Sequence, residues 1–444
     1  MSLRRLVLLF SLFFVSLPGR SVEKLPIEAF ASLPQTQSVQ LSPDGEHFAA
    51  LINQGSRSYL ITRGISEAEP KIIAKSDSSM ASDGFHWANN ERLIVGFAFA
   101  TKNYPVESVD TRLVSIKYDG SGLINLFPYS LYAQQEQIID LSDNGNDVIV
   151  SRSVNTLTSN TLTYEVYKTN INDGKTQKLH FGENDVIEWM SDRQHRIRVG
   201  KKYSDGEFEI IYCNLDGTQW KTAWRYSAFS DKAIFPMGFG ADPYILYVSA
   251  YENDRKAIFT VDLRDSKLPL TIKYFDPNRD IDGHLIYSEQ RADVVGISDT
   301  DSKGHYIFWD EDFRGLALGI DKALPDRRNF LVGFSRDETR YLLYSVSDTQ
   351  PGIYYFGDRK TKQLTPIGFT YPALKPEMLA GKKIVRYKAR DGREIEGYLT
   401  LPKGVDSKAL PTVIFPHGGP IYEDGTDFDY WTEFLPIEVM RCCK

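Results

Sequence analysis

Cysteine is scarce in this 444-residue chain, and basic residues do not outnumber acidic ones. Only three cysteines occur, and two of them, Cys442 and Cys443, are adjacent. Adjacent cysteines rarely pair because disulfide geometry is specific, so we expect the fold to depend on its core and not on disulfides. Lysine and arginine total 52 against 59 aspartate and glutamate residues, which gives a net charge of −7. An acidic surface repels phosphate, which argues against a nucleic-acid partner.

Long hydrophobic runs are also missing. The apolar run at residues 6–17 is twelve residues long, whereas a membrane-spanning helix needs about 20. It follows Arg4 and Arg5 and precedes Gly19-Arg20-Ser21, which offers small residues for cleavage, the layout of a secretory signal peptide. We therefore expect residues 1–21 to be a signal peptide. The mature protein is then exported, periplasmic or secreted, without a membrane span.

No metal-binding pattern stands out. The seven histidines are scattered without an H-x-H or H-E-x-x-H motif, so we expect no metal and no other cofactor. Residues 278–289 have the spacing of an EF-hand calcium loop, with Asn278 at its first position. That loop needs a helix on each side, whereas residues 285–297 favour a strand and a turn, so calcium is disfavoured. We interpret the acidic run at residues 310–312 as a solvated turn.

A turn-plus-strand unit recurs seven times. It begins as L-S-P-D-G-E at Leu41 and as F-S-R-D-E-T at Phe334, and its second positions are 42, 88, 142, 191, 240, 288 and 335, spaced 46 to 54 residues apart. A second hairpin with an aromatic strand lies between copies. Two hairpins per period make a four-stranded sheet, and sheets repeated every 40–50 residues are typical of a β-propeller. The 13% aromatic content also favours strands. We predict a mainly β fold with a seven-bladed β-propeller at residues 25–374. A stack of sandwich domains, the alternative, would not explain a single period.

The period stops after Pro372. Residues 382–402 predict a hairpin, and the short apolar strand at residues 412–415 leads into Pro416-His417-Gly418-Gly419-Pro420. Two glycines let the backbone approach a ligand closely and point N–H groups outward. In α/β-hydrolases, a His-Gly-Gly turn after an early strand donates one N–H of the oxyanion hole. A plain turn is the alternative, but the position behind the hairpin and the strand favours the functional interpretation.

Taken together, these segments resemble the prolyl oligopeptidase family of serine peptidases, in its exported acylaminoacyl-peptidase and dipeptidyl-aminopeptidase-like branch. The resemblance covers nearly all of the mature chain up to about Leu435. It implies a propeller that filters access to an α/β-hydrolase domain acting on peptides with Ser-His-Asp chemistry. It also implies that Gly419 is the oxyanion-hole residue and that His417, Gly418 and Pro420 shape the turn. His417 does not match the family's catalytic base.

The chain departs from the family in its last part. No G-x-S-x-G nucleophile motif occurs, and G-F-S-R-D at Gly333 fails at its last position. Residues 378–444 are far fewer than the roughly 200 that such a domain usually needs. We therefore interpret them as an N-terminal fragment of a peptidase domain that lacks the triad's Ser, Asp and His. Without these groups the chain should not hydrolyse peptides. The Glu-Glu pair with which aminopeptidase members grip a substrate amine is absent too.

The tail at residues 436–444 is unlike the rest of the chain. Translated in a neighbouring frame, permitted codons give Asn-Arg-Gly-Tyr-Ala-Val-Leu, with which family members usually continue. Our hypothesis is a frameshift after Leu435, so that residues 436–444 are out of frame and the peptidase is truncated. A free-standing β-propeller that binds peptides or proteins without catalysis is the alternative. Substrate length, cleavage preference and oligomeric state are not predicted.

Overall fold

The computed structural model describes residues 25–76, 80–101, 108–127, 136–142, 145–154, 163–179, 185–300, 306–403, 408–418, 424–437 and 441–443. The expected signal peptide lies outside these residues. The chain divides into two compact units. The larger consists of Ser32–Glu377 and Thr426–Phe428, and the smaller consists of Met1–Ala31, Met378–Gly425 and Asp429–Lys444. Each unit is described by itself below.

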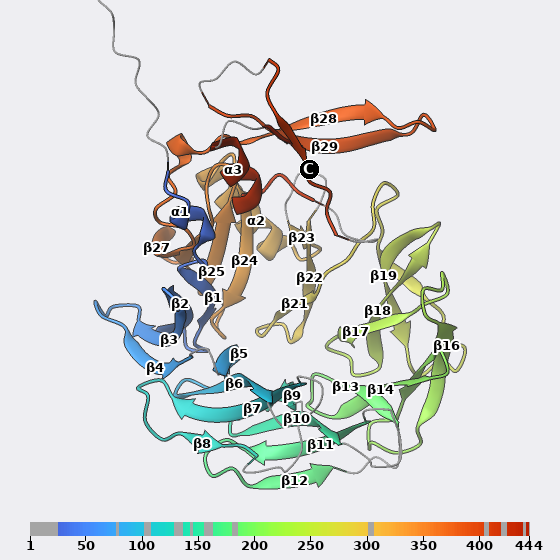
Figure 1. Ribbon diagram of the computed structural model, residues 1–444. Helices are drawn as coiled ribbons and strands as arrows, with labels where there is room; N and C mark the ends of the chain where they lie inside the picture. Colours follow the sequence, from blue (N-terminus) through green and yellow to red (C-terminus); the bar gives the residue numbers. More distant parts are fainter. Residues whose placement is uncertain are drawn as a thin grey trace, which may run out of the picture. The chain divides into compact units, whose positions relative to one another are not determined.

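The larger unit contains seven antiparallel sheets, each with its strands in chain order. We call them blades 1 to 7 (Figure 1). Blade 1 comprises β1 (Thr36–Leu41), β2 (His47–Gln54), β3 (Arg57–Gly64) and β4 (Lys71–Lys75). Blade 2 comprises β5 (Met80–Trp87), β6 (Arg92–Thr101), β7 (Ser108–Lys117) and β8 (Ile124–Asn125). Blade 3 comprises β9 (Glu136–Leu141), β10 (Asp147–Val154), β11 (Thr163–Asn170) and β12 (Thr176–Leu179).

Blade 4 comprises β13 (Val186–Ser191), β14 (Ile197–Ser204), β15 (Glu207–Tyr212) and β16 (Lys221–Ser227). Blade 5 comprises β17 (Phe235–Phe239), β18 (Ile245–Glu252), β19 (Arg255–Asp262) and β20 (Thr271–Tyr274). Blade 6 comprises three described strands, β21 (Leu285–Ser288), β22 (Asp293–Thr300) and β23 (Tyr306–Phe308). Blade 7 comprises β24 (Arg328–Phe334), β25 (Arg340–Val346), β26 (Ile353–Asp358) and β27 (Gln363–Phe369). The predicted mainly β fold with a seven-bladed β-propeller is confirmed.

The repeat read from the sequence marks one turn in every blade. Its seven second positions lie at the end of the first strand or directly after it. In blade 1 the Ser42 hydroxyl donates to Asp44 and accepts from the His47 amide, and Ser335 does the same in blade 7 with Asp337 and Arg340. Gly45 occupies the turn at φ +71°, a conformation that costs glycine little. The repeated turn chemistry therefore fixes where each blade reverses direction.

The core of the propeller consists of seven apolar clusters, and each cluster joins two neighbouring blades. The cluster between blades 1 and 7 packs Val39 and Phe48 against Leu342 and Phe356, so it closes the ring. The described strands of blade 1 come from the start of the propeller segment, and those of blade 7 come from its end. The two blades share no described strand. Side-chain packing therefore closes the ring, with backbone hydrogen bonds such as the one from Gln35 N to Thr370 O at 2.6 Å.

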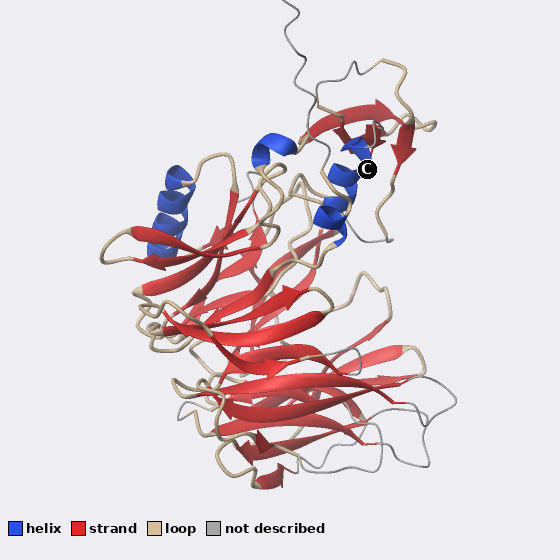
Figure 2. Cartoon of the chain, turned by 60° about the vertical axis from the view of Figure 1, so that its left-hand side comes forward, coloured by secondary structure: helices blue, strands red, loops and turns tan. Residues whose placement is uncertain are grey.

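A helix, α2 (Glu311–Ala323), lies between blades 6 and 7 (Figures 1 and 2). The sequence interpretation of residues 310–312 as a solvated turn is wrong. The Asp310 carboxylate caps the helix by accepting hydrogen bonds from the amides of Asp312 and Phe313, and the acidic residues that follow suit a helix N-terminus. Phe313 and Ile320 are buried in the cluster shared by blades 6 and 7. The helix thus supplies apolar surface to the only blade that has three described strands.

The smaller unit combines both ends of the chain. It contains α1 (Glu28–Ala31), β28 (Lys382–Lys388), β29 (Glu394–Thr400), β30 (Thr412–Ile414), α3 (Tyr430–Ile437) and β31 (Arg441–Cys443), and η1 (Pro376–Met378) precedes it. Its sheet has the order β28-β29-β31-β30. β28 and β29 form an antiparallel hairpin, and β30 is parallel to β31. Phe30 of α1 packs on Phe434 of α3 with ring centres 5.8 Å apart. None of the helices among the described residues is long and apolar enough to cross a membrane.

Candidate functional site

The predicted oxyanion turn follows β30 in the smaller unit. Gly419 and Pro420 lie outside the described residues. His417 and Gly418 are described and exposed, and the His417 Nδ1 lies 2.6 Å from the carbonyl oxygen of Gly418. A Cβ atom placed on Gly418 would meet nothing within 4 Å. The imidazole is therefore held against the turn itself, and the space beside Gly418 is open.

The next helix in the chain, α3, is well anchored. The Asp429 carboxylate accepts hydrogen bonds from the amides of Trp431 and Thr432, so it caps the N-terminus of α3. The buried carboxylate of Glu433 accepts hydrogen bonds from the amides of Ala380 at 2.7 Å and Gly381 at 3.0 Å. These bonds tie α3 to the backbone just before β28. The strand β30 and the helix α3 are thus both parts of the smaller unit.

A polar pocket of about 390 Å³ lies in the propeller. Its lining residues come mainly from β9, β13, β17 and β21, the first strands of blades 3 to 6, which lie toward the centre of the ring (Figure 1). They include three acidic residues, an arginine and a histidine, namely Asp140, Glu188, Asp192, Arg193 and His195. Charged groups of both signs that converge on one cavity are suited to binding the amide groups and charged ends of a polar ligand.

Two ion pairs join different blades at this pocket. The His195 Nδ1 lies 3.0 Å from the Asp140 Oδ2, which connects blade 4 to blade 3. Burial raises the pKa of the Asp140 carboxyl above its usual value, against the lowering effect of hydrogen bonds from Ser191 and His195. Arg193 pairs with Glu289 of blade 6 at 3.1 Å. The pairs hold the lining residues in place without filling the pocket.

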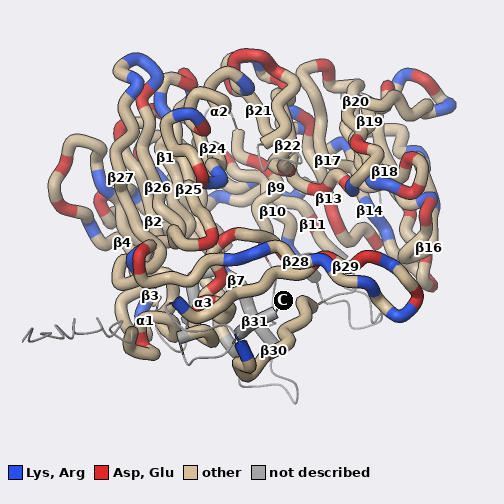
Figure 3. Tube along the Cα trace, turned by 90° about the horizontal axis from the view of Figure 1, so that it is seen from above, with Lys and Arg blue, Asp and Glu red and all other residues tan. Residues whose placement is uncertain are grey.

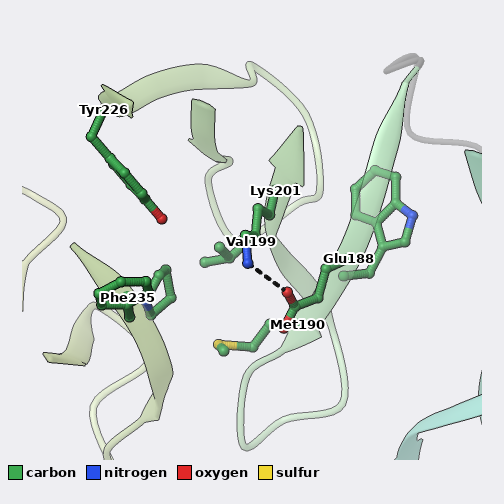
Figure 4. Close-up of a pocket in the computed structure, with 8 residues that line it drawn as sticks. Glu188, Met190, Val199, Lys201, Tyr226 and Phe235 are labelled. Carbon is green, nitrogen blue, oxygen red and sulfur yellow. Dashed lines mark hydrogen bonds and ion pairs between the residues drawn. The ribbon is translucent and has the colours of Figure 1, made fainter. Parts of the chain in front are cut away.

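A second pocket, of about 200 Å³, shares Glu188, Trp189 and Met190 with the first. Its other lining residues come from β14, β16 and β17, namely Val199, Lys201, Tyr226, Phe235 and Pro236. Lys201 pairs with Glu188 at 3.2 Å at the edge of the pocket (Figure 4). Most of the lining is apolar or aromatic, so this pocket suits an apolar group where its neighbour suits a polar one.

Tyr226 is the buried polar residue of this second pocket. Its side chain is only 5% exposed, and its hydroxyl has no hydrogen-bond partner among the described residues. Burial raises the pKa of Tyr226 to about 12, with a smaller contribution from Glu188, so the hydroxyl keeps its proton at neutral pH. In Figure 4 the hydroxyl points between Phe235, Val199 and Met190. The pocket therefore contains a hydrogen-bonding group that the protein itself does not use.

Outside these pockets, charged residues are mixed in sign. Figure 3 shows acidic and basic residues interspersed along the strands and turns. In the segment with calcium-loop spacing, the Asp282 carboxylate pairs with Lys256 at 2.9 Å, and Asp280 accepts a hydrogen bond from the Lys256 amide. Within the described ranges, no three His, Cys, Asp or Glu side chains are placed to hold a metal ion.

Sequence reasoning did not identify either pocket. The lining residues follow no motif, because they come from the first strands of different blades and from single positions such as Tyr226 and Phe235. The one available signal was indirect: the repeat located the first strands, which line the centre of a propeller. Which side chains leave a cavity there depends on how neighbouring blades pack. A single sequence does not show that packing.

The known proteins that are similar to this chain share one fold. No protein-family model matches the chain. Over 285 residues it is 22% identical to dipeptidyl aminopeptidase BIII of Pseudoxanthomonas mexicana, a match that covers 61% of this chain and 40% of the relative. The structure matches puromycin hydrolase with a TM-score of 0.63 and 15% identity, and a prolyl endopeptidase with a TM-score of 0.60 and 11% identity. This chain is similar to members of the prolyl oligopeptidase family. The predicted resemblance to that family is thereby confirmed.

The structural matches cover nearly all of this chain but only part of each related structure. It covers 94% of this chain in both structures, but 68% of puromycin hydrolase and 62% of the prolyl endopeptidase. The chain thus spans about two fifths of the dipeptidyl aminopeptidase and about two thirds of the solved structures. At these identities the structural likeness establishes the fold, and the activity of the whole relatives is not transferred with it.

Proposed function

We propose that this chain supplies the propeller and the first part of the catalytic domain of a serine peptidase that hydrolyses short peptides. The observation that carries the proposal is the order of elements in the smaller unit before the tail at residues 436–444. The antiparallel hairpin of β28 and β29 is followed by the strand β30 and then by the helix α3, which begins at Tyr430. A strand and a helix after an antiparallel hairpin are what the start of an α/β domain requires.

The position of the oxyanion turn supports the proposal. In α/β-hydrolases one oxyanion N–H comes from the loop between the third strand and the first helix. In this chain β30 is the third strand of its sheet in chain order, and His417 and Gly418 lie between it and α3. We assign the backbone N–H of Gly419 to the oxyanion, with His417, Gly418 and Pro420 as turn residues. Such donors stabilise the charge that develops on the substrate carbonyl oxygen.

The 444 residues of the chain hold no G-x-S-x-G motif, so the proposal assigns them no nucleophile. Binding and oxyanion stabilisation alone retain only a small part of a triad enzyme's acceleration. We therefore expect the 444-residue chain to bind peptides without cleaving them. The second candidate is a propeller that binds peptides and has no catalytic role, because the propeller holds two pockets.

Export and the frameshift belong to the same proposal. The charged and apolar pattern of residues 1–21 supports removal of a signal peptide and a periplasmic or secreted protein. N-terminal sequencing of the protein from its native source tests this, since a chain that begins at Met1 would contradict it. The tail at residues 436–444 supports a shifted reading frame.

One experiment separates the two candidate functions. The gene and its transcript are sequenced from the Phe434 codon onward, and all frames are translated. We expect one frame to continue into a G-x-S-x-G motif followed by Asp and then His, and protein made in that frame to be labelled by a fluorophosphonate. If every frame closes without that motif, the peptidase proposal fails and the binding propeller remains.

A further inference from the structure

The second pocket has a property that the proposed peptidase function leaves unexplained. A buried hydroxyl without a partner is costly for a folded protein, and buried polar side chains are hydrogen-bonded in the large majority of cases. The Tyr226 hydroxyl is such an exception among the described residues. It points into a cavity of about 200 Å³ whose other walls are mostly apolar. An exception of this kind, aimed into a cavity, is where a ligand's polar atom would fit.

Two aromatic side chains flank the Tyr226 ring. The Tyr226 ring lies 5.6 Å from Phe208 and 5.9 Å from Phe235, in the latter case edge to face. Phe235 is 38% exposed, so the pocket reaches the surface beside it. Such an arrangement favours a further ring, since aromatic groups at these separations attract one another beyond the burial of their area. Water at about 30 Å³ per molecule would need about seven molecules to fill the space.

We infer that this pocket between blades 4 and 5 binds one tyrosine side chain of a peptide, with its ring against Phe235 and Met190 and its phenol bonded to the Tyr226 hydroxyl. The inference rests on the proposed function, which makes peptides the ligands. The polar pocket is lined by the same three residues of β13, Glu188 to Met190. The peptide backbone on either side of the tyrosine then has polar groups to bind along that strand.

The strand β13 is placed to receive such a backbone. It pairs with β14 on one edge, and no other described strand pairs with it. An extended peptide can add to a strand edge of this kind, and its alternate side chains then enter pockets beside the strand. Tyrosine is favoured over phenylalanine because only its tip can satisfy Tyr226. Tyrosine is favoured over alanine because its ring fills the space between the apolar walls.

The test uses the full 444-residue chain and three blocked peptides, acetyl-Gly-Tyr-Gly-amide and its Phe and Ala counterparts, with binding measured by isothermal titration calorimetry. We expect the Tyr peptide to bind about 5-fold more tightly than the Phe peptide, as one hydrogen bond predicts. The Phe peptide should bind at least about 10-fold more tightly than the Ala peptide. Tyr226→Phe should bring the Tyr peptide to the affinity of the Phe peptide and leave the latter unchanged.

Two phenylalanines give a matched pair of variants. Phe235→Ala removes a wall of the pocket and should weaken both aromatic peptides about 10-fold. Phe229→Ala, in the connection that leads from β16 to Phe235 but fully exposed and outside the pocket, should change neither. Equal or undetectable binding of the three peptides would overturn the inference. So would a Tyr preference that survives Tyr226→Phe, which removes only the unpaired hydroxyl and is not expected to affect folding.

The outcome is separate from that of the peptidase proposal. Binding to this chain requires no nucleophile, so a gene that lacks the G-x-S-x-G motif leaves the Tyr preference measurable. Conversely, a gene that contains the motif, together with three peptides of equal affinity, keeps the peptidase and removes only the tyrosine site.

Discussion

At the scale of single residues, the most demanding burial in the propeller is that of Arg198. Its side chain is completely buried, and its guanidinium donates to the Asp192 carboxylate at 3.1 Å and to the carbonyl oxygens of Cys213 and Pro243. A buried charge needs such partners, because desolvation otherwise costs several kcal/mol. Arg198 thereby joins the turn before β14 in blade 4 to the turn before β18 in blade 5. Its neighbour Arg196 binds the same Asp192 from a site that is 34% exposed.

Substitution of these two arginines should have unequal effects. Arg198→Met leaves two buried carbonyl groups and part of the Asp192 charge unsatisfied, so we expect a loss of about 3–5 kcal/mol in the free energy of unfolding. Arg196→Met, the matched control, should cost about 1 kcal/mol or less because its partial exposure screens the pair. Urea unfolding followed by tryptophan fluorescence measures both. Equal shifts of the two midpoints would show that burial does not set the strength of these contacts.

The thiol of Cys213 gives a prediction about pH. Burial raises its pKa to about 11, against the lowering effect of Arg198. Because the thiolate is the nucleophile, alkylation by iodoacetamide in a Cys442→Ser/Cys443→Ser background should be slow at about pH 8. Its rate should keep rising toward pH 11, whereas an unperturbed thiol levels off near about pH 9. A profile that levels off at the lower pH in the folded protein would contradict the burial of this group.

At the scale of elements, α3 depends on its first turn and on Glu433. The carboxylate is 1% exposed and accepts hydrogen bonds from the amides of Ala380 and Gly381. Glu433→Ala leaves these donors buried without a partner, so we expect a loss of about 2–4 kcal/mol in the stability of the smaller unit. Protease cleavage between β27 and β28 should then become at least about 10-fold faster. Asp429→Ala, which removes only the N-cap, should cost about 1 kcal/mol, and cleavage as fast as in Glu433→Ala would refute the special role of Glu433.

The elements also show what the sequence could predict. The seven turns were found because small or polar residues suited to a turn recur at the same place in each blade, with the serine and aspartate contacts of Ser42 and Ser335 in blades 1 and 7. The helix α2 was missed although Asp310 caps it and Phe313, Leu316, Ala317 and Ile320 follow a helical spacing. That spacing indicates an amphipathic helix, but the aromatic repeat around it favoured strands. The pocket residues had no such signal, since their meeting depends on how blades 4 and 5 pack.

At the scale of the whole propeller, the ring has one junction where the two ends of the propeller segment meet. Blades 1 and 7 contact each other through their cluster, through Arg340 and Glu46 with 2.5 Å between charged atoms, and through the hydrogen bond from Arg336 N to Pro43 O. No strand crosses this junction in the described part of the chain. It is therefore the interface whose loss would open the ring, because the other blades are also connected by the chain itself.

Gly368 of β27 probes this junction because it lies against Thr36 of β1. A Cβ atom at Gly368 would lie 2.5 Å from the Thr36 Cγ2, whereas one at Gly333 in β24 of the same blade would meet only Leu342 Cδ1 at 3.9 Å. We expect Gly368→Ala to lower the free energy of unfolding by about 1–3 kcal/mol through overpacking. Gly333→Ala, the matched control, should be near neutral.

A double-mutant cycle decides whether the effect belongs to the junction. Thr36→Ala removes the clashing methyl group, so the pair Gly368→Ala/Thr36→Ala should be more stable than the sum of the single losses by about 1 kcal/mol. If the two losses add, Gly368 acts within blade 7 alone. If the double mutant loses less stability than the two single losses together, side-chain packing between the first and last blades stabilises the closed ring. The two blades share no described strand that could do so instead.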